Sequence, residues 1–185
     1  MHIKPLTTPF TDDAIQRLKA GDAVTIDGIL YTARDAAHKR LVDMLAQGKE
    51  LPVDFSGQAV YYAGPCPNRP GRVIGPVGPT TSGRMDAYAP ALMAKGMKVM
   101  IGKGTRSQAV IDAIKAMGGI YFAAVGGAGA LLSQCVTGVR LAAFGDLGTE
   151  AIYELTVRDF PAVVAIDTQG KNIYDGGGGK WITGP

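Results

Sequence analysis

Through the middle of the chain, short β-prone runs alternate with stretches of helical periodicity. Runs rich in Val, Ile, Tyr and Phe predict strands at 59–63, 99–101 and 120–125. Helices are predicted at about 85–95 and 107–117, because apolar residues recur there three and four positions apart. Regular alternation of this kind predicts an α/β fold, in which layers of helices cover a sheet.

Both ends of the chain carry further β-prone runs. The runs at 23–26 and 29–32 flank Asp27-Gly28, and an Asp-Gly pair between two such runs predicts a two-residue hairpin turn. Near the end, strands are predicted at 151–157 and 163–167. Since hairpins pair strands antiparallel, we expect a mixed sheet. Further helices are predicted at 11–20, at 33–47 and from Gly126 toward Cys135.

Length and charge limit the kinds of protein that this chain can be. Its 185 residues predict a single domain, 1–185, with a flexible glycine-rich tail at about 176–185. A formal net charge of +3 is too small for a nucleic-acid-binding surface, which clusters many cations on one face. No apolar run is long enough for a membrane-spanning helix, and none follows a basic start, so we expect neither a membrane span nor a signal peptide.

The sequence contains two cysteines, Cys66 and Cys135. Two isolated thiols make neither a disulfide framework nor a zinc ribbon, and an iron–sulfur cluster usually takes three or four cysteines. We therefore expect this chain alone to bind no metal and no cofactor. Reduced thiols are typical of the cytoplasm, which is the location that we predict.

Residues 75–86 read G-P-V-G-P-T-T-S-G-R-M-D and form the sharpest motif of the chain. They close a loop at 64–83 that is rich in proline and glycine and runs into a predicted helix. Backbone N–H groups converge at such a junction and favour an anion. Thr80 and Thr81 add hydroxyls, and Arg84 adds a guanidinium fork that matches a carboxylate or a phosphate. An ordinary capped turn uses the same residue types, so the motif alone leaves both interpretations open.

Two further strand-to-helix junctions carry cations. Residues 32–40, T-A-R-D-A-A-H-K-R, place Arg34 and His38 on one face of the predicted helix. Arg34 is a second candidate anion ligand, and His38 is a candidate acid/base group. Residues 102–110, G-K-G-T-R-S-Q-A-V, hold Lys103 between two glycines, where uncrowded backbone lets its side chain reach a ligand. A solvated basic helix face and a plain turn are the structural alternatives.

Two nucleotide-binding interpretations are excluded. Residues 78–85 nearly match the P-loop pattern G-x-x-x-x-G-K-[ST], but Arg84 replaces the lysine, and Met85, which cannot ligate Mg²⁺, replaces the serine or threonine. Residues 126–130, G-G-A-G-A, do not fit the dinucleotide pattern G-x-G-x-x-G, and the early β-α-β context is missing. We expect these glycines to permit close packing of a helix against a strand instead.

The three cationic junctions follow three predicted strands, and ligands of α/β proteins bind outside the carboxyl ends of strands. We therefore expect Arg34, Arg84 and Lys103 to line one anion pocket. Two arginines and a lysine with hydroxyls between them suit a small dicarboxylate. The sequence adds no cluster of metal ligands and no Ser-His-Asp set, so the chain resembles half of a site.

Taken together, the motifs at 32–40, 78–86 and 102–110 resemble the β subunit of class I, iron–sulfur-dependent fumarase. In one-chain members of that family, this part is fused as the C-terminal domain. Residues 148–153, G-T-E-A-I-Y, and 157–162, V-R-D-F-P-A, are similar as well. The resemblance covers nearly the whole chain in the same order, which makes it far more specific than any one motif.

The resemblance implies a swivelling β/β/α domain and a hydro-lyase that reversibly hydrates fumarate to L-malate. It also implies a separate α subunit that carries a 4Fe–4S cluster on three cysteines, in a heterotetramer, with a homodimer expected in isolation. Thr80 would lie at the carbon that gains or loses a proton, and His38 would be an acid/base candidate. The substrate carboxylates would be bound by Arg34, Thr81, Arg84 and Lys103.

Two alternatives remain open. The L-tartrate dehydratase β subunit shares the R-D-x-x-H and G-P-T-T signatures, although the G-R-M-D ending and the R-S-Q after Lys103 are more similar to fumarase. A module of another class, which binds a small anion without catalysis, would keep the same pocket and need no partner. The stoichiometry of subunits does not follow from the sequence.

Overall fold

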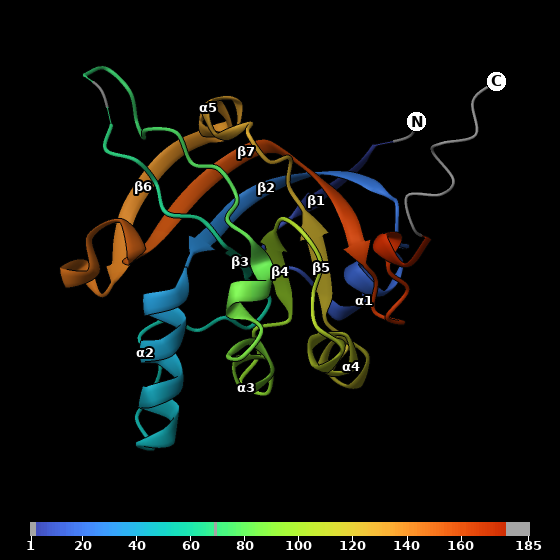
Figure 1. Cartoon of the computed structure of the whole chain (residues 1–185). Helices are drawn as coiled ribbons and strands as arrows, with labels where there is room; N and C mark the ends of the chain where they lie inside the picture. The colour runs from blue at the N-terminus through green and yellow to red at the C-terminus, as the bar shows by residue number, and fades with distance from the viewer. Residues whose placement is uncertain (1–2, 69, 177–185) are drawn as a thin grey trace.

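The computed structural model describes residues 3–68 and 70–176, and this part of the chain forms one mixed sheet with helices packed against it (Figure 1). The strands are β1 (Lys4–Thr7), β2 (Ala23–Thr32), β3 (Ala59–Tyr61), β4 (Val99–Gly102), β5 (Ile120–Ala123), β6 (Val136–Ala143) and β7 (Ile152–Ile166). The α-helices are α1 (Asp12–Gln16), α2 (Asp35–Ala46), α3 (Ala89–Met93), α4 (Gln108–Met117) and α5 (Gly129–Leu132). Short 3₁₀ helices are η1 (Ser82–Met85), η2 (Ser133–Cys135), η3 (Gly145–Glu150) and η4 (Ile173–Gly176).

The strand pairings close on themselves. The described strands follow the order β1-β2-β3-β4-β5-β7-β6, and the first five run parallel to their neighbours. The long strand β7 runs antiparallel to β5, to β6 and also to β2. Because β7 pairs with both β2 and β5, the strands β2, β3, β4, β5 and β7 form a closed ring. In Figure 1, β6 and β7 arch above the short strands β3, β4 and β5. The predicted mixed α/β sheet is confirmed.

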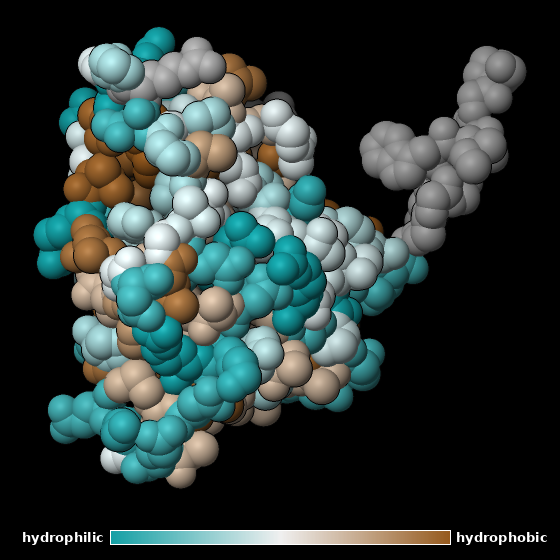
Figure 2. All heavy atoms as spheres, turned by 60° about the vertical axis from the view of Figure 1, so that its left-hand side comes forward, coloured by the Kyte–Doolittle hydropathy of each residue, from teal (hydrophilic) through white to brown (hydrophobic). Residues whose placement is uncertain are grey.

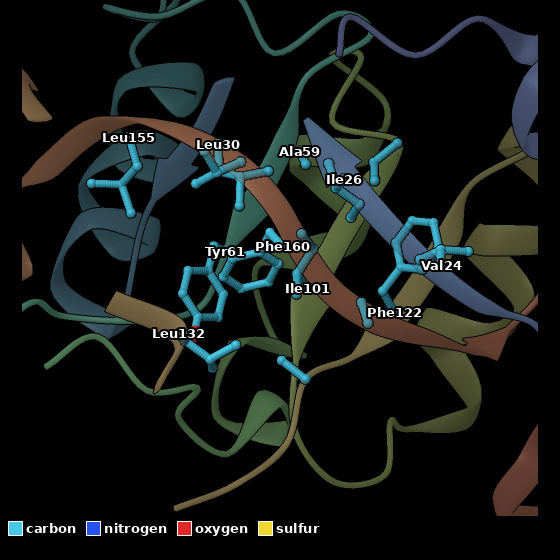
Figure 3. Packing of buried hydrophobic residues seen from close by; sticks show 14 of the residues in the cluster. Val24, Ile26, Leu30, Ala59, Tyr61, Ile101, Phe122, Leu132, Leu155 and Phe160 are labelled. Carbon is cyan, nitrogen blue, oxygen red and sulfur yellow. The ribbon is translucent and has the colours of Figure 1, made fainter. Parts of the chain in front are cut away.

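Alternate residues of β3, β4 and β5 belong to two different hydrophobic clusters, as the two-residue period of a strand requires. Tyr61 belongs to the inner cluster, where its ring packs edge-on against Phe160 with centroids 5.2 Å apart (Figure 3). Tyr62, the next residue, belongs to the outer cluster that α2, α3 and α4 cover. Both faces of β3, β4 and β5 are therefore buried, which explains why these three strands are apolar throughout.

The predicted hairpin at Asp27-Gly28 is wrong. The two runs form one continuous strand, β2, and the pair sits at an irregularity in its pairing with β7. The hydroxyl of Thr8 accepts a hydrogen bond from the backbone N–H of Ile29 and occupies the place that a Cβ at Gly28 would take. Glycine at φ 108° therefore serves a bulge rather than a turn, because the strands on both sides continue the ladder.

The strands predicted at 151–157 and 163–167 are one strand, β7, so the second predicted hairpin is wrong too. Asp159 adopts φ 51° inside it, and Pro161 lies opposite Thr25. One of the three antiparallel partners of β7 is β6, a strand that the sequence did not predict. Its side chains Val139 and Leu141 are exposed, so β6 lacks the buried alternation that marks a strand. In Figure 2, hydrophobic side chains gather along the left edge of the upper half of the molecule.

The helix predicted at 33–47 is confirmed by α2, whereas only the short α1 forms within the predicted 11–20. The prediction at 107–117 is confirmed by α4, which Gly118 ends in the left-handed conformation. The helix predicted at 85–95 is split into η1 and the short α3, because Pro90 lies in the first turn of α3 and helices rarely continue through the residue before a proline. None of the helices in the described ranges has the length and apolar character to cross a membrane. Apart from Gly176, the predicted tail lies outside the described residues.

Candidate functional site

The three cationic motifs meet at the edge where the parallel strands end. Arg34 follows β2 and precedes α2, while Lys103 follows β4 directly. Between them runs the end of the proline- and glycine-rich loop, which forms single bridges between Pro79 and Ala63, beyond β3, and between Thr81 and Lys103. The segments at 32–40, 78–86 and 102–110 are therefore neighbours in space, since the carboxyl ends of parallel strands share one edge.

Backbone hydrogen bonds fix the central segment of the site. The N–H of Thr80 donates to the carbonyl of Tyr62 at 2.7 Å, and the N–H of Ser82 donates to the carbonyl of Lys103 at 2.9 Å. The N–H of Lys103 donates in return to the carbonyl of Thr80 at 3.4 Å. These bonds extend the ladders of β3 and β4 by a few residues. The Thr80 hydroxyl is thereby held 3.5 Å from Nη1 of Arg84, which donates to it.

Each arginine of the site is paired with a carboxylate of the chain. Two nitrogens of the Arg84 guanidinium contact the two carboxylate oxygens of Asp35, Nε to Oδ1 at 2.9 Å and Nη2 to Oδ2 at 2.8 Å. Arg34 lies 3.3 Å from the carboxylate of Glu150, which also accepts the N–H of Ala36. The sequence did not single out either carboxylate as a partner. Asp35 stands inside the first motif, whereas nothing local in the sequence connects Glu150 with Arg34.

Glycines let backbone and long side chains pass closely beside the site. A Cβ at Gly64 would lie about 3.0 Å from Cδ of Arg34, and one at Gly126 would lie 3.3 Å from Cδ of Lys103. Gly129 packs against the backbone of Gly78 and accepts a hydrogen bond from Val77. The predicted close packing at 126–130 is thus observed, but it involves the loop before Thr80 rather than a strand.

Lys103 differs from the two arginines. Its side chain is partly exposed, and within residues 3–68 and 70–176 no carboxylate lies within ion-pair distance of its ammonium group. Arg84 is half exposed, Arg34 is a quarter exposed, and Thr81 is exposed. The site thus presents guanidinium, ammonium and hydroxyl groups to an open surface. Such groups bind an anion with more than one acceptor oxygen.

His38 lies beneath this surface and does not share the exposed face of Arg34. Its ring is fully buried, edge-on against Tyr62 at 5.1 Å between centroids. Nδ1 contacts the carbonyl of Arg34 at 2.9 Å and must carry the proton of this bond, because a carbonyl only accepts. Burial lowers the pKa of His38 to about 4, and the nearby cation Arg106 acts in the same direction. The imidazole is therefore neutral near pH 7.

A buried polar cluster that the sequence did not reveal supports the segment from below. Arg106 is buried and donates from Nε to Asp86 at 2.6 Å, and its guanidinium lies over the rings of Tyr62 and Tyr121. The hydroxyl of Tyr121 lies 2.9 Å from Oγ of Ser82. Asp86 and Arg106 both stand in the quoted motifs, yet an arginine seldom loses all its solvent contact, so its burial could not be expected.

The described residues hold no group of three or more His, Cys, Asp or Glu side chains that could bind a metal ion. Cys66 is exposed, Cys135 is partly buried, and both are free thiols. Two separate cysteines do not fit an iron–sulfur cluster, which takes three or four.

Comparisons with known proteins agree on one family. The family model described as "Fumarase C-terminus" matches residues 2–177. The putative class I fumarate hydratase of Geobacillus stearothermophilus is 40% identical over 177 residues, which cover 92% of this chain and 33% of that relative. The anaerobic class I fumarate hydratase of Escherichia coli K12 is 39% identical over 153 residues, covering 82% of this chain and 28% of the relative.

A third relative is a separate subunit. The putative L(+)-tartrate dehydratase subunit beta of Methanocaldococcus jannaschii is 37% identical over 171 residues, which cover 89% of this chain and 88% of the relative. The chain thus spans about a third of the length of the fumarate hydratases that it matches and most of the length of the tartrate dehydratase subunit. With every described residue inside the family match, the chain belongs to the fumarase C-terminus family.

Proposed function

We propose that this chain is the dicarboxylate-binding part of a hydro-lyase that reversibly hydrates fumarate to L-malate together with a partner subunit. The observation that supports it most is the convergence of Arg34, Arg84 and Lys103 at one edge of the sheet, with Thr80 and Thr81 between them. The likeness to class I fumarate hydratases supports the choice of substrate.

In this proposal Arg34 and Arg84 bind the two carboxylates of the substrate, and Lys103 and Thr81 add further donors. The carboxylates of Glu150 and Asp35 already hold the two guanidinium groups in place, so the arginines need little reordering when substrate arrives. The guanidinium fork keeps donors free, because it has five N–H groups and the carboxylate partner uses only some of them.

Thr80 is proposed to transfer the proton at the reacting carbon. A threonine hydroxyl is a weak base by itself, and a cation beside it stabilises the deprotonated form. Nη1 of Arg84 lies 3.5 Å from Oγ1 of Thr80 and supplies such a charge. His38 is proposed as an acid/base group that acts from below rather than on the surface. With Nδ1 protonated, its bare Nε2 is the atom that can accept a proton.

The catalytic electrophile is proposed to come from the partner. Since the residues of this chain do not fit an iron–sulfur cluster, we propose that a separate α subunit carries a 4Fe–4S cluster on three cysteines of its own. The tartrate dehydratase relative is a beta subunit, which supports a two-chain organisation. We propose a heterotetramer for the complex, a homodimer for the chain alone, and the swivelling β/β/α fold for this domain. The free thiols support a cytoplasmic location.

L-tartrate dehydratase is the second candidate, because the relative with that name matches this chain along nearly its full length. Substrate competition distinguishes the two. On the complex with the cognate α subunit, kept anaerobic, kcat/KM is measured for fumarate and for L-tartrate. We expect the higher value for fumarate. A higher value for L-tartrate would replace fumarate as the substrate, and binding of dicarboxylates without turnover of either would favour a non-catalytic anion-binding module.

A further inference from the structure

Arg106 makes an unusual set of contacts for a residue outside the candidate site. Its side chain has 0% exposure, its Nε donates to Oδ1 of Asp86 at 2.6 Å, and its guanidinium carbon lies 5.3 Å and 5.0 Å from the ring centroids of Tyr62 and Tyr121. The other oxygen of Asp86 accepts the N–H of Ser107. The cation is thus held by one carboxylate and two aromatic faces.

The same cluster holds the Thr80–Arg84 segment at three points. At its start, the N–H of Thr80 bonds to the carbonyl of Tyr62. In its middle, Oγ of Ser82 is hydrogen-bonded to the hydroxyl of Tyr121. The Tyr121 hydroxyl donates its own proton to the carbonyl oxygen of Gly104 at 2.9 Å, because a carbonyl oxygen can only accept. Just after its end, Asp86 bonds to Arg106. The segment that presents Thr80 and Arg84 to solvent therefore rests on a buried cation.

Stability alone is a weak reason for such a cluster. Removing a guanidinium and a carboxylate from water costs several kcal/mol, and well-packed apolar residues of the same volume often stabilise a fold as well or better. Arg106 is also incompletely satisfied, because Nη2 has no hydrogen-bond partner among the residues described. Unlike apolar packing, the ion pair and the hydrogen bonds of this cluster are directional, so they fix the orientation of the groups that they join.

We propose that Arg106 is a positioning residue for the site: through Asp86, Tyr62 and Tyr121 it fixes the Thr80–Arg84 segment in the geometry that substrate requires. Arg106 itself touches no substrate. The expected effect of Arg106 on fumarate hydration rests on the proposed function, whereas its expected effect on the order of the Thr80–Arg84 segment does not.

The first experiment measures the segment without any activity. Amide hydrogen exchange of the full chain is followed by mass spectrometry for wild type and for Arg106→Lys, which keeps the charge and loses the planar fork. The N–H groups of Thr80, Ser82 and Asp86 are hydrogen-bonded, so their exchange reports the order of the segment. We expect exchange at 80–86 to rise at least about tenfold while β4 and β5 stay protected.

Two further variants keep this experiment decisive. Arg140→Lys is the matched control, because Arg140 pairs with Glu154 on β6 and β7 and does not contact the segment. Tyr121→Phe preserves the ring and removes only the hydroxyl, so it keeps the test open if Arg106→Lys fails to fold. Unchanged exchange at 80–86 in both test variants, or an equal rise in β4 and β5, would overturn the inference.

The second experiment measures kcat and KM of the complex with the cognate α subunit. Loss of folded protein lowers kcat and leaves KM unchanged, whereas a displaced clamp raises KM. For Arg106→Lys and Asp86→Asn we expect KM to rise at least about tenfold, with the double variant no worse than the worse single one, because the pair acts as a unit. An unchanged KM, with looser exchange at 80–86, would overturn the catalytic half of the inference. A wild-type complex inactive on fumarate and L-tartrate would refute the proposed function, and the exchange result would still judge the positioning role.

Discussion

Arg84 of η1 and Asp35, the first residue of α2, form a two-pronged ion pair, with Nε–Oδ1 at 2.9 Å and Nη2–Oδ2 at 2.8 Å. Asp35 directly follows Arg34 in the chain, so the carboxylate that orients one arginine of the site is the neighbour of the other. The two proposed carboxylate ligands are thereby mechanically linked, and a change at either one is expected to affect the other.

Replacing Arg84 by alanine removes one proposed carboxylate ligand and leaves Asp35 unpaired. We expect kcat/KM of the complex for fumarate to fall at least about 30-fold, which corresponds to about 2 kcal/mol, as for loss of a charged hydrogen-bond partner. Arg17→Ala is the control, because Arg17 forms an exposed ion pair with Asp13 on α1, away from the site. Kinetics of both complexes check the prediction, and a near-normal kcat/KM in Arg84→Ala would remove Arg84 from the site.

The neighbouring buried residues Tyr61 and Tyr62 are expected to respond differently to loss of the hydroxyl group. The hydroxyl of Tyr61 donates to the carbonyl of Val77 at 2.8 Å, so Tyr61→Phe should lower the free energy of unfolding by about 1–2 kcal/mol. The hydroxyl of Tyr62 is buried with no partner among the described residues, so Tyr62→Phe should leave that free energy unchanged or raise it by up to about 1 kcal/mol. Urea unfolding measures both. Equal losses in the two variants would contradict the assignment of Tyr62 as unpaired.

Gly102 lies where β4 ends, in contact with the segment above it. A Cβ there would come within 1.9 Å of Oγ of Ser82, so Gly102→Ala should push Ser82 away and lower the free energy of unfolding by about 1–3 kcal/mol. Gly83→Ala is the matched control, since the nearest atom to its added Cβ is the carbonyl oxygen of Thr105 at 3.8 Å, and a change within about 0.5 kcal/mol is expected. If thermal unfolding showed equal effects, the close contact at Gly102 would be disproved.

The burial of His38 predicts how stability depends on pH. Its pKa is lowered from 6.5 to about 4 in the folded chain, so between these values the unfolded chain binds a proton that the folded chain does not. The free energy of unfolding should therefore fall as pH decreases through this window, by about 2 kcal/mol between about pH 7 and about pH 4.5.

His38→Gln should lose this part of the pH dependence, and urea unfolding at the two pH values measures it. The carboxylates of Asp22, Asp54 and Asp146 have pKa values lowered below 3.8, so their contribution to stability is lost as pH falls through their unfolded value. Wild type and His38→Gln share these groups, so the difference between the two slopes reports His38. An equal slope in wild type and His38→Gln would show that the imidazole is not buried in its neutral form.

Local sequence patterns correctly predicted the elements that depend mainly on interactions between residues close together in the chain. The helix α4 has an apolar stripe and a glycine cap, and the cationic junctions end strands whose runs are visibly β-prone. The hairpin at Asp27-Gly28 failed because Thr8, distant in sequence, replaces the missing ladder partner beside the bulge. The edge strand β6 was missed because its exposed apolar residues give no buried alternation.

In the candidate site too, residues within local motifs were predicted, and contacts between distant parts of the chain were not. The sequence identified Arg34 and Lys103 at strand-to-helix junctions and Arg84 in the motif at the end of the proline- and glycine-rich loop, and folding makes these three segments neighbours. It did not identify Glu150 as the partner of Arg34, because the two lie far apart in the chain and only folding brings them into contact. It placed His38 and Arg34 on one helix face, but Arg34 is the extended N-cap residue that precedes α2, whereas His38 lies inside α2 on its buried stripe with Ala37 and Leu41.

The central claim is that this chain supplies cationic ligands for a dicarboxylate and that a companion supplies the rest of the catalyst. The most direct measurement is fumarate hydration by the purified chain alone and by the chain purified anaerobically with its cognate α subunit, with iron determined in both. We expect background activity and no iron for the chain alone, and iron together with hydration for the complex. Clear hydration by the chain alone, or an iron-containing complex that hydrates no fumarate, would contradict the account.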